Sequence, residues 1–117
     1  MDLLADYAFV DCLLLGFRAN ADLRALDVEV EACFPSTMGS REKKPLSVHM
    51  TECREVLFKA NPEFWRDLDR PYRNGDTMKA NEVTRFSVTR EAADRYRAAL
   101  ESDMLTLELV CRSAMLA

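Results

Sequence analysis

Apolar and polar side chains alternate strictly in two segments of the chain, residues 24–34 and residues 105–112. Successive side chains of a strand point to opposite faces, so this period of two predicts two strands, each with one dry and one wet face. Antiparallel sheets commonly contain such half-buried strands. On the wet face of the first strand the alternation places Asp27, Glu29 and Glu31 together.

Less regular alternation predicts further strands elsewhere. Residues 46–58 fit one bent strand or two short ones, and residues 83–89 fit another short strand. The opening segment is ambiguous, because its apolar residues fit both a helical period and a strand period. We favour a strand over about residues 8–18, since residues 20–22 then supply a turn into the next strand.

Two segments carry helical signals instead. After Thr89, a residue type suited to an N-cap, apolar residues recur at three- and four-residue spacing up to Met104 and predict a longer amphipathic helix. A short helix is expected to begin at Asn61, with Pro62 at its first helical position, and to stop at Pro71. Together these elements predict an α+β fold, a mainly antiparallel sheet with one longer amphipathic helix and one short helix.

Length and composition indicate a single globular domain over residues 1–117, because 49% of the residues are apolar and 31% are charged. The polar segment at about residues 35–45, bounded by Pro35 and Pro45, predicts a mobile connection between strands. The net charge is −4, and residues 1–40 hold two arginines against seven carboxylates. This balance disfavours duplex nucleic acid as a partner and favours a neutral or basic one.

The cysteines and the opening residues bear on the compartment. Four cysteines are scattered singly at Cys12, Cys33, Cys53 and Cys111, without a CxxC pair. No apolar run approaches the length of a membrane span, and the first residues are acidic rather than basic. We therefore expect free thiols in a reducing cytoplasm and no membrane association, with a Cys33–Cys111 disulfide as the alternative.

Catalytic options are few because His49 is the sole histidine. Zinc ligands usually come in close pairs, and the three glycines form no phosphate-binding loop. We expect His49 to be a half-exposed strand residue, and we expect no enzymatic activity, no cofactor and no metal. The alternative is a small-ligand or enzymatic pocket lined by His49, Glu52 and Asp11.

Two features favour protein binding. The strand face with Asp27, Glu29 and Glu31 suits recognition of a basic partner, although a merely solvated face is the simpler interpretation. Residues 64–73 concentrate the residue types that dominate interface hot spots, and they can also cap the core and pair with nearby acids. The candidate contact residues in this second segment are Trp65, Arg66, Arg70, Tyr72 and Arg73.

The order of the strands adds a resemblance. Residues 9–14, 26–30, 46–48 leading to Val56, and 105–111 together resemble the pattern of small sheet-rich immunity proteins of bacterial polymorphic toxin systems. The resemblance implies an inhibitor that neutralises a toxin by binding it. We therefore expect a non-catalytic protein-binding domain, whose partner is a protein such as a basic toxin domain. A homodimer that pairs through a strand edge is a third hypothesis.

Overall fold

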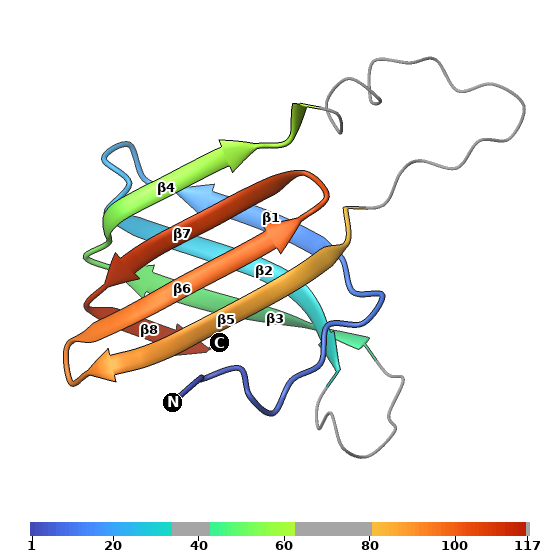
Figure 1. The fold of residues 1–117 in the computed structure, drawn as a ribbon, viewed down its shortest axis with the longest axis horizontal. Helices are drawn as coiled ribbons and strands as arrows, with labels where there is room; N and C mark the ends of the chain where they lie inside the picture. The colour runs from blue at the N-terminus through green and yellow to red at the C-terminus, as the bar shows by residue number, and fades with distance from the viewer. Residues whose placement is uncertain (34–42, 63–80, 117) are drawn as a thin grey trace, which may run out of the picture.

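The computed structural model describes residues 1–33, 43–62 and 81–116. In these residues eight strands form two four-stranded antiparallel sheets that lie in two layers (Figure 1). The first sheet has the order β1-β2-β3-β8, and the second has the order β4-β7-β6-β5. The strands are β1 (Leu14–Ala19), β2 (Ala25–Cys33), β3 (Lys43–Thr51), β4 (Arg54–Ala60), β5 (Val83–Ala92), β6 (Arg95–Ser102), β7 (Leu105–Cys111) and β8 (Ser113–Leu116).

The chain passes between the two sheets at two tight crossings. One crossing, at Glu52 and Cys53, joins β3 to β4, and the other, at Arg112, joins β7 to β8. Within the second sheet β5, β6 and β7 follow one another as hairpins while β4 lies beside β7, which is a Greek-key order. Because Arg112 donates its backbone N–H to the Thr51 carbonyl at 3.3 Å, both crossings lie at the same end of the sandwich.

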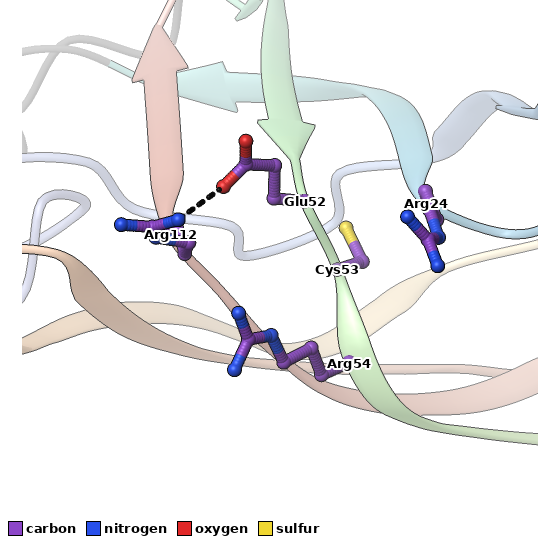
Figure 2. Close-up of a pocket in the computed structure, with 5 residues that line it drawn as sticks. All are labelled: Arg24, Glu52, Cys53, Arg54 and Arg112. Carbon is purple, nitrogen blue, oxygen red and sulfur yellow. Dashed lines mark ion pairs between the residues drawn. The ribbon is translucent and has the colours of Figure 1, made fainter.

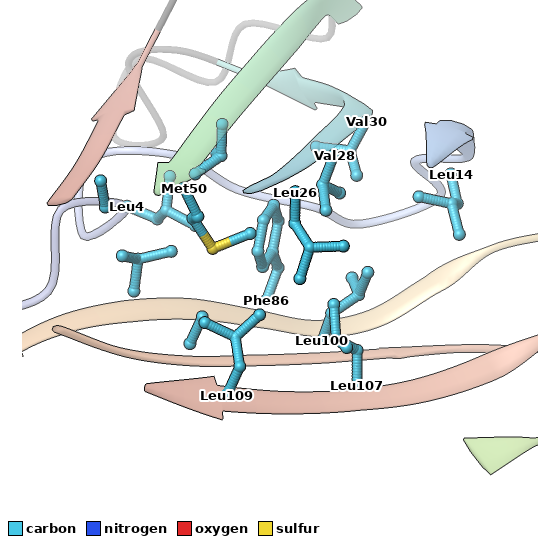
Figure 3. Packing of buried hydrophobic residues seen from close by; sticks show 14 of the residues in the cluster. Leu4, Leu14, Leu26, Val28, Val30, Met50, Phe86, Leu100, Leu107 and Leu109 are labelled. Atoms are coloured by element: carbon cyan, nitrogen blue, oxygen red, sulfur yellow. The ribbon is translucent and has the colours of Figure 1, made fainter. Parts of the chain in front are cut away.

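The hydrophobic core lies between the sheets, where the inward-facing side chains of both meet (Figure 3). On β2 and β7 every second residue is buried, as strict alternation requires. The residues buried in this way are Leu26, Val28 and Val30 of β2 and Leu105, Leu107 and Leu109 of β7. Phe86 of β5 and Met50 of β3 fill the space between them. The two strands expected from strict alternation are thereby confirmed.

The first residues of the chain cover the outer edge of β5. The Leu3 N–H donates to the Val88 carbonyl at 2.8 Å. One carboxylate oxygen of Asp2, Oδ1, accepts two hydrogen bonds of 3.0 Å, from the backbone N–H groups of Leu4 and Val88. Leu4 then packs into the core with 2% of its surface exposed. An edge that would otherwise be open to strand addition is therefore occupied by the chain itself.

We expect Asp2→Ala to lower the free energy of unfolding by about 1–3 kcal/mol, because the substitution leaves two backbone N–H groups without their acceptor. Urea denaturation at neutral pH measures the change. Asp6→Ala is the matched control, since Asp6 is exposed and makes no hydrogen bond or ion pair within the described residues. Equal losses in the two variants would show that Asp2 does not hold this edge.

The expected α+β fold is wrong, because the segment interpreted as the longer helix is a hairpin. β5 continues to Ala92, and β6 returns from Arg95 between β5 and β7. Ala98 and Leu100 are buried on alternate positions of β6 while Arg97 is exposed, which is a strand pattern. Alanine, leucine and arginine favour helices intrinsically, but pairing on both sides and burial override that preference. In the described part of the chain no helix has the length and apolar character needed to span a membrane.

The remaining expectations are met in part. Residues 46–58 contain two strands, β3 and β4, which belong to different sheets. β1 begins at Leu14 rather than near residue 8, and the expected turn follows it, with the Leu23 N–H donating to the Asn20 carbonyl at 3.1 Å. Pro45, placed in the mobile connection, is paired in β3. Most of that connection and most of the short helix fall outside the described residues.

Candidate functional site

The three acidic residues of β2 lie on the outer face of the first sheet. β2 is paired on one side with β1 and on the other with β3, so both neighbouring strands fix the positions of its side chains. Asp27, Glu29 and Glu31 occupy alternate positions and point away from the core, as their spacing predicts. The structure therefore brings these three predicted site residues together on one face, but it gives each a different surrounding.

Asp27 is paired with the imidazole of His49. His49 lies opposite Asp27 on β3, and its Nδ1 faces Asp27 Oδ1, with the two side chains 52% and 41% exposed. His49 is thus the half-exposed strand residue expected from the sequence. A carboxylate at Nδ1 favours the tautomer that leaves Nε2 free to accept a proton, which is the arrangement of a general base. On the other side of Asp27, Arg18 of β1 is its ladder neighbour.

Glu29 occupies a shallow pocket at the middle of this face. Its ladder neighbours are Gly16 on β1 and Ser47 on β3, two of the smallest residues, and they line a single hollow of about 340 Å³ that extends over the three strands. The carboxylate of Glu29 is exposed, and no described residue pairs with it. No sequence pattern points to Gly16 and Ser47, because only the strand register places them beside Glu29.

Glu31 has a structural contact of its own. Its Oε1 accepts a hydrogen bond of 3.0 Å from the backbone N–H of Leu13, and the Leu13 carbonyl accepts the Glu31 N–H at 2.8 Å. These bonds attach the segment that precedes β1 to the end of β2. Of the three acids, Glu29 alone therefore keeps a carboxylate without a protein partner among the described residues.

The other predicted site residues are not assembled with this face. Glu52, placed with His49 in the alternative pocket, forms an ion pair of 3.2 Å with Arg112 at the crossing between sheets. Asp11 precedes β1, where its carbonyl accepts a hydrogen bond of 2.5 Å from Lys43. The structure therefore does not form the expected pocket of His49, Glu52 and Asp11. The predicted contact residues Trp65, Arg66, Arg70, Tyr72 and Arg73 lie outside the described residues.

All four cysteines are buried and free, and they form two neighbouring couples. Cys12 and Cys33 are within side-chain hydrogen-bonding reach, and the Ala8 carbonyl accepts from Cys33 N–H at 2.9 Å and from Cys12 Sγ at 3.8 Å. Burial, with a smaller contribution from Cys33, raises the pKa of the Cys12 thiol to about 11. Among the described residues, no three His, Cys, Asp or Glu side chains are placed to hold a metal ion.

Cys111 lies beside Cys53 rather than beside Cys33. Burial, with a smaller contribution from the neighbouring Cys53 thiol, raises the pKa of Cys111 to about 11. Cys33 pairs with Lys43 at the start of β3, whereas Cys111 immediately precedes the residue that hydrogen-bonds to Thr51 at the end of β3. The whole length of β3 separates the two thiols, so the alternative Cys33–Cys111 disulfide is incompatible with this fold.

Comparison of the chain with protein-family models, with curated proteins and with solved structures finds no match.

Proposed function

We propose that this chain is a non-catalytic protein-binding domain, of the immunity type, that neutralises a partner protein through the outer face of β1, β2 and β3. The observation that carries the proposal is the unpaired carboxylate of Glu29, which stands in a pocket between Gly16 and Ser47. A lysine or arginine side chain of a partner can enter this hollow and reach the carboxylate. The small side chains of Gly16 and Ser47 leave room for a close approach, and a hydrogen bond between two charged groups is stronger than one between neutral groups.

Charge and rigidity both support binding of a basic surface. The protein carries a net charge of −4, and a complementary partner is attracted before contact is made. Because Glu29 lies on a strand that is hydrogen-bonded along both edges, binding requires little ordering of the backbone. Four buried free thiols fit a reducing compartment, so we place this interaction in the cytoplasm.

The test uses the protein encoded beside this chain, since genes for an inhibitor and its target are expected to adjoin. We expect Glu29→Lys to slow association with that purified protein about tenfold and to flatten its dependence on salt. Stopped-flow mixing over a range of ionic strengths measures both effects. The free energy of unfolding should stay within about 0.5 kcal/mol of the parent, because Glu29 is exposed.

Glu108→Lys is the matched control, because Glu108 is exposed on β7 in the opposite sheet and its reversal changes the net charge equally. Association that slows equally in both variants would assign the effect to net charge and remove the β2 face from the interface. Failure of the adjacent gene product to bind at micromolar concentration, or a toxic effect that survives co-expression with this chain, would contradict the immunity function.

The Asp27–His49 pair favours a second candidate, an enzymatic domain that uses the imidazole as a base. Its geometry supports that function less well than binding. Both side chains are about half exposed, whereas general bases gain their strength in sites that exclude water. In the binding proposal the same pair forms one rim of the pocket around Glu29, and its imidazole can donate to or accept from a partner.

A further inference from the structure

Three arginines from separate parts of the chain meet at the end of the sandwich where the chain crosses between the sheets. Arg24 precedes β2, Arg54 begins β4, and Arg112 connects β7 to β8. Together with Glu52 and Cys53 they line a pocket of about 510 Å³, which we call the arginine pocket. Figure 2 shows Arg54 and Arg112 on one side of Cys53 and Arg24 on the other.

Backbone hydrogen bonds hold these segments in place. The Cys53 N–H donates to the Arg24 carbonyl at 2.9 Å, which ties the turn before β2 to the first crossing. The Arg112 N–H donates to the Thr51 carbonyl at 3.3 Å, which ties the second crossing to the first. The three arginine side chains therefore extend from a fixed frame rather than from independent loops.

An irregular backbone sets the direction of Arg54. Glu52 and Glu55, on either side of Cys53 and Arg54, have positive φ angles of 53° and 51°. The pairing of β4 with β7 also shifts register between Arg54 and Leu57, which marks a β-bulge. Left-handed residues other than glycine are strained, and bulges often redirect side chains beside binding sites. Because of this irregular backbone, Arg54 leaves the direction that a regular β4 strand would give it.

The positive charge of the arginine pocket is only partly neutralised by the protein. Glu52 and Asp94 share Arg112, at 3.2 and 3.7 Å. Arg24 has a longer contact of 3.8 Å with Asp22, outside the pocket. No described residue forms an ion pair or hydrogen bond with the guanidinium of Arg54. Of the three arginines of this pocket, Arg54 alone therefore keeps an unpaired guanidinium among the described residues.

A second hollow extends the same region. It measures about 290 Å³ and shares Arg54 and Arg112 with the arginine pocket, and Asp94 and Arg95 complete its charged lining. Taken together, the two hollows are lined by four arginines and two carboxylates. A ligand seated between Arg54 and Arg112 can contact both hollows at once.

The chemistry of the pocket is that of anion binding rather than of covalent catalysis. Burial raises the pKa of the Cys53 thiol, so this thiol is protonated and a poor nucleophile at neutral pH. Guanidinium groups, in contrast, are charged at every physiological pH and present paired donors that match the oxygens of a carboxylate or a phosphate. The volume of the arginine pocket lies within the range of small-molecule sites, about 300–1,000 Å³.

We propose that the arginine pocket binds a small ligand through an oxyanion group, either a phosphate or a carboxylate, held by Arg54 and Arg112 and closed on one side by Arg24. The proposal rests on the convergence of three segments and on the unpaired guanidinium of Arg54. It is independent of the binding face on β2, because the residues of the two sites do not overlap.

Titration with pyrophosphate and with citrate tests the proposal and separates the two sources of the oxyanion. We expect at least one of the two probes to bind in the millimolar range or tighter by calorimetry and to shift the side-chain Nε–Hε signals of Arg54 and Arg112 in NMR spectra. Arg54→Gln should weaken that binding about tenfold, because it removes one charged pair of donors. Preference for pyrophosphate identifies a phosphate ligand, and preference for citrate identifies a carboxylate ligand.

Arg85→Gln is the matched control, because Arg85 lies on β5, is exposed and pairs with Glu101 at 3.9 Å, away from the pocket. It should leave the affinity of both probes unchanged. Equal weakening by Arg54→Gln and Arg85→Gln would reduce the effect to net charge and overturn the proposal. Absence of binding by both probes at millimolar concentration would overturn it as well. Arg54 and Arg85 are both exposed, so both variants should unfold at the same urea concentration as the parent protein. This measurement checks that the comparison is between folded proteins.

Discussion

Leu107→Ala is expected to lower the free energy of unfolding by about 3–5 kcal/mol, a large fraction of the roughly 5–15 kcal/mol typical of a folded domain. Leu107 is 1% exposed and lies on β7, between β4 and β6 in the second sheet. Its ladder neighbours are Leu100 and Phe58. Truncation removes buried methyl groups and leaves a cavity that strands paired on both sides cannot close, so the transfer and cavity costs add.

Urea denaturation followed by circular dichroism measures this loss, and Leu57→Ala provides its control. Leu57 belongs to the same sheet and undergoes the same chemical change, but 58% of its surface is exposed. We expect the control to change stability by no more than about 0.5 kcal/mol. Similar losses at the two positions would contradict the assignment of Leu107 to the core and, with it, the face-to-face packing of the sheets.

The second large effect concerns pH. The unperturbed thiol pKa is 9.0, and the folded protein raises the pKa of both Cys12 and Cys111 to about 11. The folded state therefore retains these two protons at pH values where the unfolded chain has released them. The resulting stability is fully present below pH 9 and is lost as the pH rises through 11. The expected loss is about 2–3 kcal/mol for each thiol.

The double variant Cys12→Ala, Cys111→Ala isolates this contribution. Lysines and tyrosines that titrate at high pH are common to both proteins, so their effects cancel in the comparison. We expect the free energy of unfolding of the parent to fall more steeply between pH 8 and pH 11 than that of the variant. The lower stability of the variant at neutral pH does not affect this comparison, because the comparison concerns the slope of stability against pH. Parallel profiles would show that the two thiols are not buried as described.

Strands could be identified from the sequence wherever one face of the strand is exposed to solvent and the other face is buried. Val28 and Glu29, or Leu107 and Glu108, alternate so clearly that no helical period competes. In β6 the apolar residues fit both periods, since Tyr96 and Leu100 are four apart while also standing at alternate strand positions. Only pairing with β5 and β7 decides between the two, and pairing between distant segments leaves no local signal.

The same limit applies to the two sites. Asp27 and Glu29 are two residues apart on one strand, so their position on a common face could be predicted from the sequence alone. The free carboxylate of Glu29 depends on which residues of β1 and β3 lie beside it, and register is a property of the assembled sheet. The arginine pocket was missed entirely, because Arg24, Arg54 and Arg112 are scattered along the chain and meet only through the crossings.

The left-handed kink at Glu55 also has a consequence for the addition of further strands at the edge of β4. β4 is an edge strand with exposed Leu57 and Phe58, a combination that invites fibre formation in other proteins. Because the backbone departs from extended geometry at Glu55, the regular part of β4 is confined to residues 57–60. We expect an incoming strand to gain few hydrogen bonds from a ladder that short, so the kink should disfavour stacking through the exposed apolar side chains.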